Sequence, residues 1–492
     1  MDYTRVFVGG VWKRPSSGSS FDSIDPYSAQ AWASFPDCDD LDVNEAVAAA
    51  KSAFEREPWR SDGFLRARLM FRLADLLDRE AERLGAIESR DNGKTVRENV
   101  GQAHFAARVY RYFAGLADKI DGRVVPLDTA NTFDFTVCEP YGVCALLLAW
   151  NSPLQLLANK LAPALAAGNT VVIKPSEVAP ASVLEFGKLI EEAGFSPGIV
   201  NIITGLGPHV GRRLAEHPDV ELVSLTGGVS TGRAIAAIAA QAPKKAVLEL
   251  GGKSPNIIFE DADLDQAVKG AVAGIFNASG QTCIAGSRLL VQESIADEIV
   301  DRLSARARTI RLGDPANPTT EMGPLATEPH MRRVLGFIQS AVEEGAKVAT
   351  GGSRAIRDDL RRGFFVEPTI LTGVLPHMRI AQEEVFGPVL SVLRFQSEAD
   401  AVAIANQTEF GLAAGIWTSN LDRALTVSRA IRAGTVWVNT YRSSSPAAPF
   451  GGFKRSGLGR ERGKEALLDY LQTKNVMIAL GAATSKSQSI HA

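Results

Sequence analysis

Cysteine is scarce in this chain, and no two cysteines have a spacing that suggests a shared role. Only four occur in 492 residues, with no CxxC motif and no short-spaced histidine pair beside them. Disulfide scaffolds are rich in cysteine, and zinc sites need clustered Cys and His ligands. We therefore expect no disulfide framework, no metal site and a reducing, cytoplasmic environment.

Long apolar runs and an excess of one charge are also missing. One uncharged stretch, residues 141–159, is interrupted by NSPLQ, whereas a membrane span needs about 20 predominantly apolar residues. The N-terminal MDYTRVFVGGVWKRP lacks the apolar core of a secretory signal. The net charge of −3 gives no basic surface for nucleic acid or an anionic membrane. We expect a small-molecule substrate, with neither nucleic acid nor membrane as a partner.

Strand-like and helix-like segments alternate along most of the chain. The β-rich runs VVIKP, GIVNIIT, VELVSLTG and KAVLELGG are separated by helix-like stretches such as residues 181–193 and 210–217. Helical periodicity over residues 44–60 and 64–84 precedes them, and a second strand–helix series follows Gly252. This order predicts an α/β fold with parallel sheets covered on both faces. Ligands of such sheets bind at the carboxyl ends of the strands.

Two segments break the alternation. Residues 124–140 alternate like an antiparallel hairpin, and LLDYLQTKNVMIAL near the C-terminus reads as a strand. Such strands either pair across a subunit interface or form a covered edge within the chain, and both interpretations remain open. The polar tail after Leu480 is expected to be poorly ordered.

Phosphate-binding signals follow three of the strand-like runs. GLGPHVG departs from the dinucleotide fingerprint, and TGGVSTG opens a helix whose N–H groups could face a pyrophosphate. Both turns are also explained by backbone geometry alone. In VVIKPSE, Lys174 and Glu177 could bind ribose hydroxyls, and the glutamate would disfavour a 2′-phosphate. Ser176 and Glu177 also suit a helix N-terminus, and the two readings are compatible.

One cysteine, Cys283, lies among small and polar residues in FNASGQTCIAGSR. Gly280 and Gly286 would let a substrate approach the backbone, and an N–H near the thiol could receive an oxyanion. A buried structural cysteine is the alternative, although these neighbours would form a poor apolar core. Glu249 ends the run LELGG, where partial burial would suit it to proton abstraction; the alternative is a surface glutamate.

In combination these motifs resemble the NAD(P)-dependent aldehyde dehydrogenase superfamily. The matching set, in order from about residue 149 to 463, is AWNSPL, VVIKPSE, SLTGGVSTG, LELGGKSPNII, FNASGQTCIAGSR, EEVFGPV, GTVWVN and PFGGFKRSGLGRERG. The resemblance implies a Rossmann-like NAD-binding domain (residues 1–120 and 141–251) and a catalytic α/β domain (252–452). It also implies a small β oligomerisation element with the C-terminal tail (121–140 and 468–492), in a homodimer or homotetramer.

The resemblance also implies a mechanism. Cys283 attacks an aldehyde to give a thiohemiacetal, Asn151 and the Cys283 N–H hold the oxyanion, and loss of hydride leaves a thioester. Glu249 activates the water that releases the acid, which favours hydrolysis over transfer to coenzyme A. Lys174 is placed both with these catalytic groups and among the NAD contacts, with NADP as the less favoured cofactor. The implied cofactor contacts are Trp150, Lys174, Ser176, Glu177, Gly207, Gly211, Thr226, Gly227, Gly228, Leu250, Glu384 and Phe386.

The substrate pocket departs from the family pattern. Ser152, Asn159 and Ser444 stand where many relatives carry bulky apolar residues, so we expect a wider, wetter pocket and a polar or carboxylated semialdehyde. Arg442 could pair with a substrate carboxylate, or it is a surface or interdomain arginine. The predicted pocket residues are Ser152, Leu156, Asn159, Thr282, Ile284, Tyr441, Arg442, Ser444 and Phe450.

Two other functions remain open from the sequence. A cysteine hydrolase would use Cys283 with a histidine base, but none of the six histidines lies in a recognisable motif for one. A non-catalytic relative would bind NAD without turnover, which the retention of Cys283, Glu249 and Asn151 disfavours.

Overall fold

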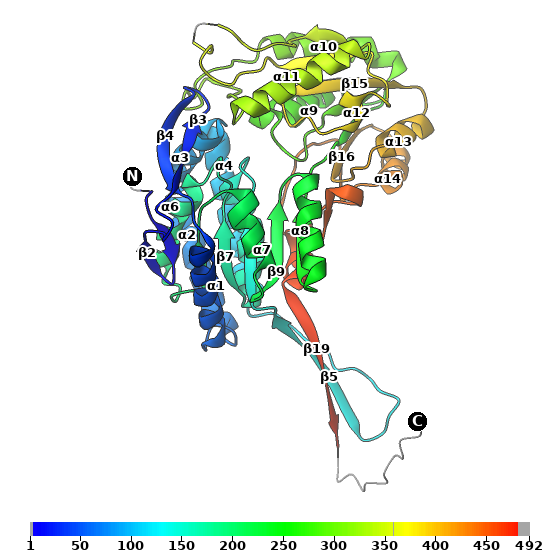
Figure 1. Cartoon of the computed structure of the whole chain (residues 1–492). Helices are drawn as coiled ribbons and strands as arrows, with labels where there is room; N and C mark the ends of the chain where they lie inside the picture. Colours follow the sequence, from blue (N-terminus) through cyan, green and yellow to red (C-terminus); the bar gives the residue numbers. More distant parts are fainter. Residues whose placement is uncertain (1–2, 358, 481–492) are drawn as a thin grey trace.

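The structure is a computed structural model that describes residues 3–357 and 359–480. Two α/β bodies lie one above the other, and a narrow two-stranded arm extends from the lower one (Figure 1). The tail after Leu480, for which poor order is expected, lies outside the described residues. Within the described ranges, no helix combines the length and apolar character needed to cross a membrane.

The chain begins with two small antiparallel pairs followed by four helices. The strands are β1 (Val6–Val8), β2 (Val11–Lys13), β3 (Ser20–Asp25) and β4 (Gln30–Pro36), and the helices are α1 (Asp40–Glu55), α2 (Gly63–Arg79), α3 (Ala81–Asn92) and α4 (Val96–Ala114). The helical periodicity predicted over residues 64–84 is confirmed, but it is divided between two helices, α2 and α3, which meet at Glu80. A capping box between Thr95 and Glu98 starts α4 and fixes its direction.

The first sheet has eight strands in the order β18-β10-β9-β6-β7-β8-β1-β2. Its further strands are β6 (Val143–Leu147), β7 (Thr170–Lys174), β8 (Val200–Ile202), β9 (Val220–Thr226), β10 (Lys245–Glu249) and β18 (Gly457–Leu458), with helices α5 (Pro153–Ala167), α6 (Ala181–Ala193), α7 (Arg212–Glu216) and α8 (Val229–Gln241). The five strands β6 to β10 are parallel to one another. Their apolar side chains pack into a buried cluster on each face, as expected of parallel strands covered on both sides.

The second sheet has seven strands in the order β13-β14-β15-β12-β11-β16-β17. These are β11 (Pro255–Ile258), β12 (Arg288–Gln292), β13 (Lys347–Thr350), β14 (Thr369–Thr372), β15 (Val389–Phe395), β16 (Ala413–Trp417) and β17 (Thr435–Val438), with helices α9 (Leu264–Phe276), α10 (Ala296–Arg308), α11 (Glu328–Glu343), α12 (Arg379–Gln382), α13 (Glu398–Asn406) and α14 (Leu421–Ala430). The last helix, α15 (Gly463–Asp469), packs against α5 of the first body instead. All pairs except β13–β14 are parallel, and each face again carries an apolar cluster.

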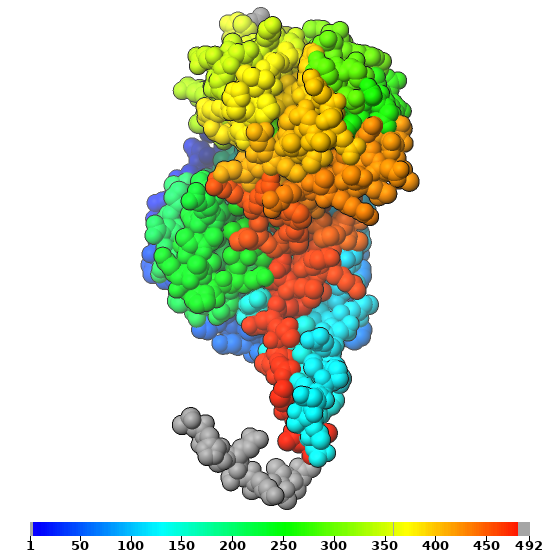
Figure 2. Space-filling view, turned by 90° about the vertical axis from the view of Figure 1, so that its right-hand side faces the viewer, coloured from blue at the N-terminus to red at the C-terminus, as the bar shows by residue number. Residues whose placement is uncertain are grey.

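The projecting arm pairs two segments that are far apart in the sequence. β5 (Thr132–Pro140) runs antiparallel to β19 (Leu471–Ala479) over its whole length. The predicted hairpin within residues 124–140 is reduced to one bridge between Val124 and Phe135. Figure 2 shows the arm standing clear of the rest of the molecule, so its strands are not a covered edge within this chain.

Candidate active site

A strained turn at the end of α9 carries Cys283. Ala278 and Ser279 have φ of 55° and 54°, and Gly280 follows with φ of 72°. A Cβ on Gly280 would lie 2.1 Å from the carbonyl oxygen of Gly387, so only glycine lets the turn pack here. The prediction that Gly280 makes room for a substrate is therefore wrong; it makes room for another protein segment.

Tyr441, predicted in the substrate pocket, does not line the cavity at Cys283. Its hydroxyl donates a hydrogen bond to the Ile284 carbonyl oxygen at 3.0 Å, which places it behind the loop. A Cβ on Gly286 would meet the Tyr441 side chain at 3.0 Å. Gly286 thus accommodates this aromatic support rather than a substrate.

The buried side chain of Asn151 reaches the Cys283 loop from the start of α5. Its Nδ2 donates to the Gln281 carbonyl oxygen at 3.0 Å, and an amide nitrogen has a second hydrogen to donate. The Nζ of buried Lys94 donates to the Asn151 carbonyl oxygen at 3.0 Å and to Ser152 Oγ at 3.1 Å. Lys94, which was not predicted from the sequence, therefore fixes the backbone from which the Asn151 amide extends.

Glu249 lies at the end of β10, in the interior, with 3% of its surface exposed. Neither carboxylate oxygen has a hydrogen-bond partner among the described residues. Burial and, next, the charge of Glu461 raise the pKa of Glu249 well above its ordinary value. A carboxyl with a raised pKa and two unused oxygens is suited to accept a proton.

The environment of Cys283 favours the thiol form over the thiolate. Burial, followed by the charges of Glu384, Glu249 and Glu461, raises the pKa of Cys283 to about 12. The nearby Arg462 guanidinium lowers it. Removal of the thiol proton therefore depends on a base and on any positive charge that enters the site.

A second buried carboxylate, Glu461, was missed by the sequence analysis. Its Oε1 accepts from Lys160 Nζ at 2.5 Å, and its Oε2 accepts from Asn159 Nδ2 at 3.0 Å. All three side chains are almost fully buried. Glu461 belongs to the motif GRERG, but only the tertiary structure brings it to α5 and near Glu249.

The cavity that contains Cys283 has a volume of about 210 Å³, below the roughly 300–1,000 Å³ of most small-molecule sites. The predicted residues that line it are Asn151, Ser152, Leu156, Asn159, Thr282, Cys283, Ile284, Arg442, Ser444 and Phe450. Lining residues that were not predicted include Gln102, Phe105, Gln155, Thr435, Trp437 and Arg462. Aromatic rings and a guanidinium from other segments also line the cavity, and a pocket wider than that of an acetaldehyde enzyme stays a prediction.

A larger groove of about 900 Å³ lies at the carboxyl ends of β6, β7 and β9. It is lined by nine of the predicted cofactor residues: Trp150, Lys174, Ser176, Glu177, Gly207, Gly211, Thr226, Gly227 and Gly228. Lys174 Nζ pairs with Glu177 Oε2 at 3.0 Å. A Cβ on Gly228 would meet no atom, so this turn is open, and Thr226 Oγ1 is buried without a partner. The open backbone turn and the unused hydroxyl fit a bound dinucleotide.

The other three predicted cofactor residues do not line this groove. The Glu384 carboxylate accepts from the Gly252 N–H at 3.0 Å, and burial raises its pKa to about 7. The ring of Phe386 lies 5.3 Å from that of Trp150, and Leu250 packs under α8 at Gly232.

His330 completes the aromatic cluster around Trp150 and was not predicted. Its Nε2 lies 2.6 Å from the Phe386 carbonyl oxygen, and its ring is 5.6 Å from the Trp150 ring. Burial lowers the pKa of His330 to about 4, so the imidazole is neutral. It therefore holds Phe386 in its left-handed conformation without adding charge to the site.

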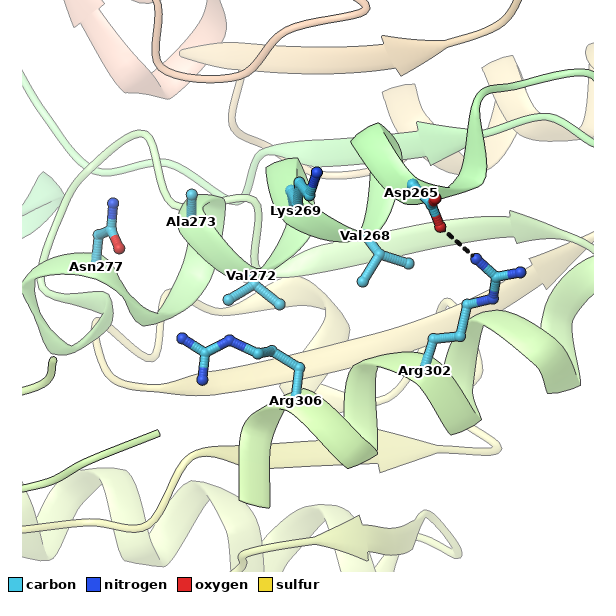
Figure 3. Close-up of a pocket in the computed structure, with 8 residues that line it drawn as sticks. All are labelled: Asp265, Val268, Lys269, Val272, Ala273, Asn277, Arg302 and Arg306. Atoms are coloured by element: carbon cyan, nitrogen blue, oxygen red, sulfur yellow. Dashed lines mark hydrogen bonds and ion pairs between the residues drawn. The ribbon is translucent and has the colours of Figure 1, made fainter. Parts of the chain in front are cut away.

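A third hollow, between α9 and α10, contains none of the predicted site residues (Figure 3). It is lined by Asp265, Val268, Lys269, Val272, Ala273, Asn277, Arg302 and Arg306. Arg302 reaches across it to Asp265 at 2.7 Å, so its charge is already paired.

The chain is similar in sequence to known proteins over nearly its whole length. The model of the Aldehyde dehydrogenase family matches residues 12–476. A (Z)-2-((N-methylformamido)methylene)-5-hydroxybutyrolactone dehydrogenase from Acinetobacter baylyi is 47% identical, covering 98% of each chain. Retinal dehydrogenase 2 from Homo sapiens is 44% identical, covering 97% of this chain and 92% of the relative.

Solved structures show the same fold. Betaine aldehyde dehydrogenase from Staphylococcus aureus in complex with NAD⁺ has a TM-score of 0.97 and 38% identity, covering 99% of this chain and 97% of the other. The NAD⁺ complex of an aldehyde dehydrogenase from Bacillus cereus has a TM-score of 0.95 and 40% identity, covering 98% and 97%.

Proposed function

The chain belongs to the aldehyde dehydrogenase family, and we propose that it oxidises an aldehyde to the carboxylic acid with NAD⁺ and water, without coenzyme A. The observation that carries this proposal is the cavity where Cys283 and Asn151 meet, with the unpartnered Glu249 carboxylate close enough to affect the Cys283 pKa. A thiol, an oxyanion donor and a base are the groups that acyl transfer through cysteine requires.

The thiol of Cys283 would lose its proton to Glu249 and attack the aldehyde carbon, forming a thiohemiacetal. The free Nδ2 hydrogen of Asn151 and the Cys283 N–H, which has no acceptor among the described residues, would bind the oxyanion. One such donor contributes about 2.7–4 kcal/mol in related oxyanion sites. NAD⁺, which the groove fits, would supply the hydride acceptor when bound. Loss of the hydride from the thiohemiacetal would leave a thioester on Cys283.

Glu249 would release the proton taken from Cys283 to solvent, and its carboxylate would then take a proton from water as the water attacks the thioester. Its raised pKa gives the carboxylate enough basicity for this step. The acid leaves, and the Cys283 thiolate recovers the proton. Hydrolysis by an interior base is the reason that we propose a reaction independent of coenzyme A.

Lys174 and Glu177 would bind the adenosine ribose, with Lys174 counted also among the catalytic groups. A carboxylate at this place repels a 2′-phosphate, so NAD is favoured and NADP is the weaker cofactor. The turn at Thr226, Gly227 and Gly228 would hold the pyrophosphate through backbone N–H groups. Glu384 would contact the nicotinamide ribose, and Phe386 the nicotinamide end.

The substrate would be a short, polar or carboxylated aldehyde. The cavity is small, and Ser152, Asn159 and Ser444 line it with hydrogen-bonding groups. A panel of aldehydes with reduced enzyme tests the function: NADH should form with NAD⁺ and more slowly with NADP⁺. If no aldehyde produced NADH, the proposal would fail.

A cysteine hydrolase is the competing function. It would need an imidazole beside the thiol, and no histidine among the described residues lines the Cys283 cavity. Ester cleavage alone does not separate the two functions, since a thioester-forming dehydrogenase also cleaves esters. Aldehyde oxidation that depends on NAD⁺ does.

The β5–β19 arm would join copies of the chain into a homodimer or homotetramer. Val124, Phe133, Met477 and Ile478 expose apolar surface on it. We accordingly assign residues 121–140 and 468–492 to oligomerisation and the tail, 1–120 and 141–251 to NAD binding, and 252–452 to catalysis. All four cysteines are free, which suits a cytoplasmic enzyme. Light scattering on the purified chain measures the assembly, and a monomer would contradict this role.

A further inference from the structure

The guanidinium of Arg462 is buried in the same cavity as Cys283. Only 8% of the residue is exposed, and the guanidinium lies over two aromatic rings, 5.1 Å from Phe105 and 4.8 Å from Phe450. The residue has a φ of 60°, an uncommon conformation for a side chain larger than that of asparagine. The fold thus holds a positive charge inside a small cavity, where it is costly unless it is paired.

No acidic side chain among the described residues forms an ion pair with Arg462. Its Nε donates to Asn159 Oδ1 at 3.3 Å, and its Nη1 donates to Ser444 Oγ. A guanidinium has five N–H donors, so most of them have no protein acceptor. Its sequence neighbour Glu461 is already bound by Lys160 at 2.5 Å.

Arg462 also faces the reacting groups. Burial lowers the pKa of Arg462, while Glu461, Cys283 and Glu249 raise it, so the guanidinium lies within electrostatic range of the thiol and the base. A ligand that contacts both Cys283 and Arg462 would span the cavity. Because the cavity is about 210 Å³, such a ligand is short.

The other arginines near the site have different partners. Arg442, the candidate from the sequence, donates to the Ala273 carbonyl oxygen at 3.2 Å, and Glu98 is the nearby charge that most favours its charged form. In the hollow of Figure 3, Arg302 pairs with Asp265, while Arg306 pairs with Glu321 at 2.5 Å. Arg462 is the cavity arginine whose guanidinium is held in place by two aromatic rings and two neutral polar side chains.

We propose that Arg462 binds a carboxylate at the far end of the substrate, so that the preferred substrates are short aldehydes bearing a terminal carboxylate. This inference rests on the proposed aldehyde oxidation. Asn159 and Ser444 orient the guanidinium, and the rings of Phe105 and Phe450 hold it in plane. The carboxylate replaces the missing counter-charge, and a charge-assisted bidentate pair fixes the aldehyde relative to Cys283.

Two probes of similar size test the proposal: succinic semialdehyde, which ends in a carboxylate, and butanal, which ends in a methyl group. For the wild-type enzyme, kcat/KM with NAD⁺ should be at least about 10-fold higher for succinic semialdehyde, as expected from hydrogen bonds to a charged group. This comparison needs no variant and so does not depend on how a variant folds. Equal or higher kcat/KM for butanal would overturn the proposal.

Variants then assign the effect to one residue. Arg462→Met should lower kcat/KM for succinic semialdehyde about 10- to 100-fold more than it lowers kcat/KM for butanal. Some loss with butanal is also expected, because the guanidinium lowers the pKa of Cys283. Arg462→Lys, which keeps the charge, should recover part of the loss through a lower KM. Arg455→Met, which removes an exposed arginine paired with Glu409, is the matched control and should change neither substrate.

The outcomes separate the inference from the proposed function. If Arg462→Met lowers kcat/KM equally for both substrates, Arg462 does not bind the substrate carboxylate, although the enzyme is still an aldehyde dehydrogenase. If the wild type oxidises neither substrate nor any other aldehyde, the proposed function itself has failed. Binding of succinate, measured by calorimetry without cofactor, should also weaken in Arg462→Met, and unchanged binding would contradict the proposal.

Discussion

The cofactor groove and the Cys283 cavity adjoin at Trp150 and Asn151, but they differ in whether their charged side chains are paired. The charged residues that line the groove are paired within the protein: Lys174 with Glu177, and Arg212 with Glu216. The cavity and its surroundings instead hold charged groups that form no ion pair among the described residues, above all Glu249 and Arg462. The groove can therefore bind a ligand through hydrogen bonds to strand ends and turns. The cavity keeps its charges for the reaction and for the substrate.

The largest expected effect is a loss of aldehyde oxidation in the cavity with no change of NAD⁺ binding in the groove. Cys283→Ala removes the nucleophile and should lower kcat/KM by about 10⁴-fold or more. NAD⁺ affinity, measured by quenching of tryptophan fluorescence, should not change, because Cys283 does not line the groove. Substantial residual oxidation would show that another group is the nucleophile.

The next effect concerns the boundary between the regions. Asn151→Ala deletes the side-chain donor to the oxyanion and should lower kcat/KM by about 10²–10³-fold. The change should lie mainly in kcat, since the interaction forms as the oxyanion develops. A loss confined to KM would mean that Asn151 only helps to bind the substrate.

The two regions also differ in how many of their residues could be predicted from the sequence. The groove residues lie in continuous motifs at strand ends, so the alternation of strands and helices locates Lys174, Thr226 and Gly228 without knowledge of tertiary contacts. Phe105 and Arg462 come from distant segments and meet only after folding. Nothing in the local pattern of α4 marks Phe105 as a cavity wall.

Two errors have the same origin. Tyr441 was predicted in the pocket from its position in the loop, but its hydroxyl turns to the Ile284 carbonyl oxygen behind Cys283. Residues 124–140 were predicted to pair locally, but they do so only around Val124 and Phe135, and the partner of β5 over its whole length is β19, more than three hundred residues later. Spacing along the chain indicates neither the direction of a loop side chain nor a distant strand partner.

A smaller effect tests the paired charges of the groove. Glu177→Gln removes the repulsion of a 2′-phosphate and should raise kcat/KM with NADP⁺, relative to NAD⁺, by about fivefold, which corresponds to about 1 kcal/mol between charges about 4 Å apart. Glu192→Gln, at an exposed carboxylate paired with Arg79, is the control. If the ratio of kcat/KM with NADP⁺ to kcat/KM with NAD⁺ did not change, Glu177 would not set the cofactor preference.

The smallest effect is a shift of pH dependence. The charge of Glu461 raises the pKa of Glu249, so Glu461→Gln should lower that pKa and keep Glu249 ionised to lower pH. The acid limb of the kcat profile should therefore move to lower pH. A limb that stays in place, or moves to higher pH, would show that Glu249 is not the titrating base.

Trapping the covalent intermediate tests the central claim most directly. In Glu249→Gln, Cys283 must lose its proton to solvent and so attacks the aldehyde more slowly, but no carboxylate activates water, so the thioester that forms should accumulate. Mixing this variant with NAD⁺ and an aldehyde should release a burst of one NADH per active subunit, and mass spectrometry should find the acyl group on Cys283. Steady turnover at the wild-type rate, or an acyl group on another residue, would contradict the account.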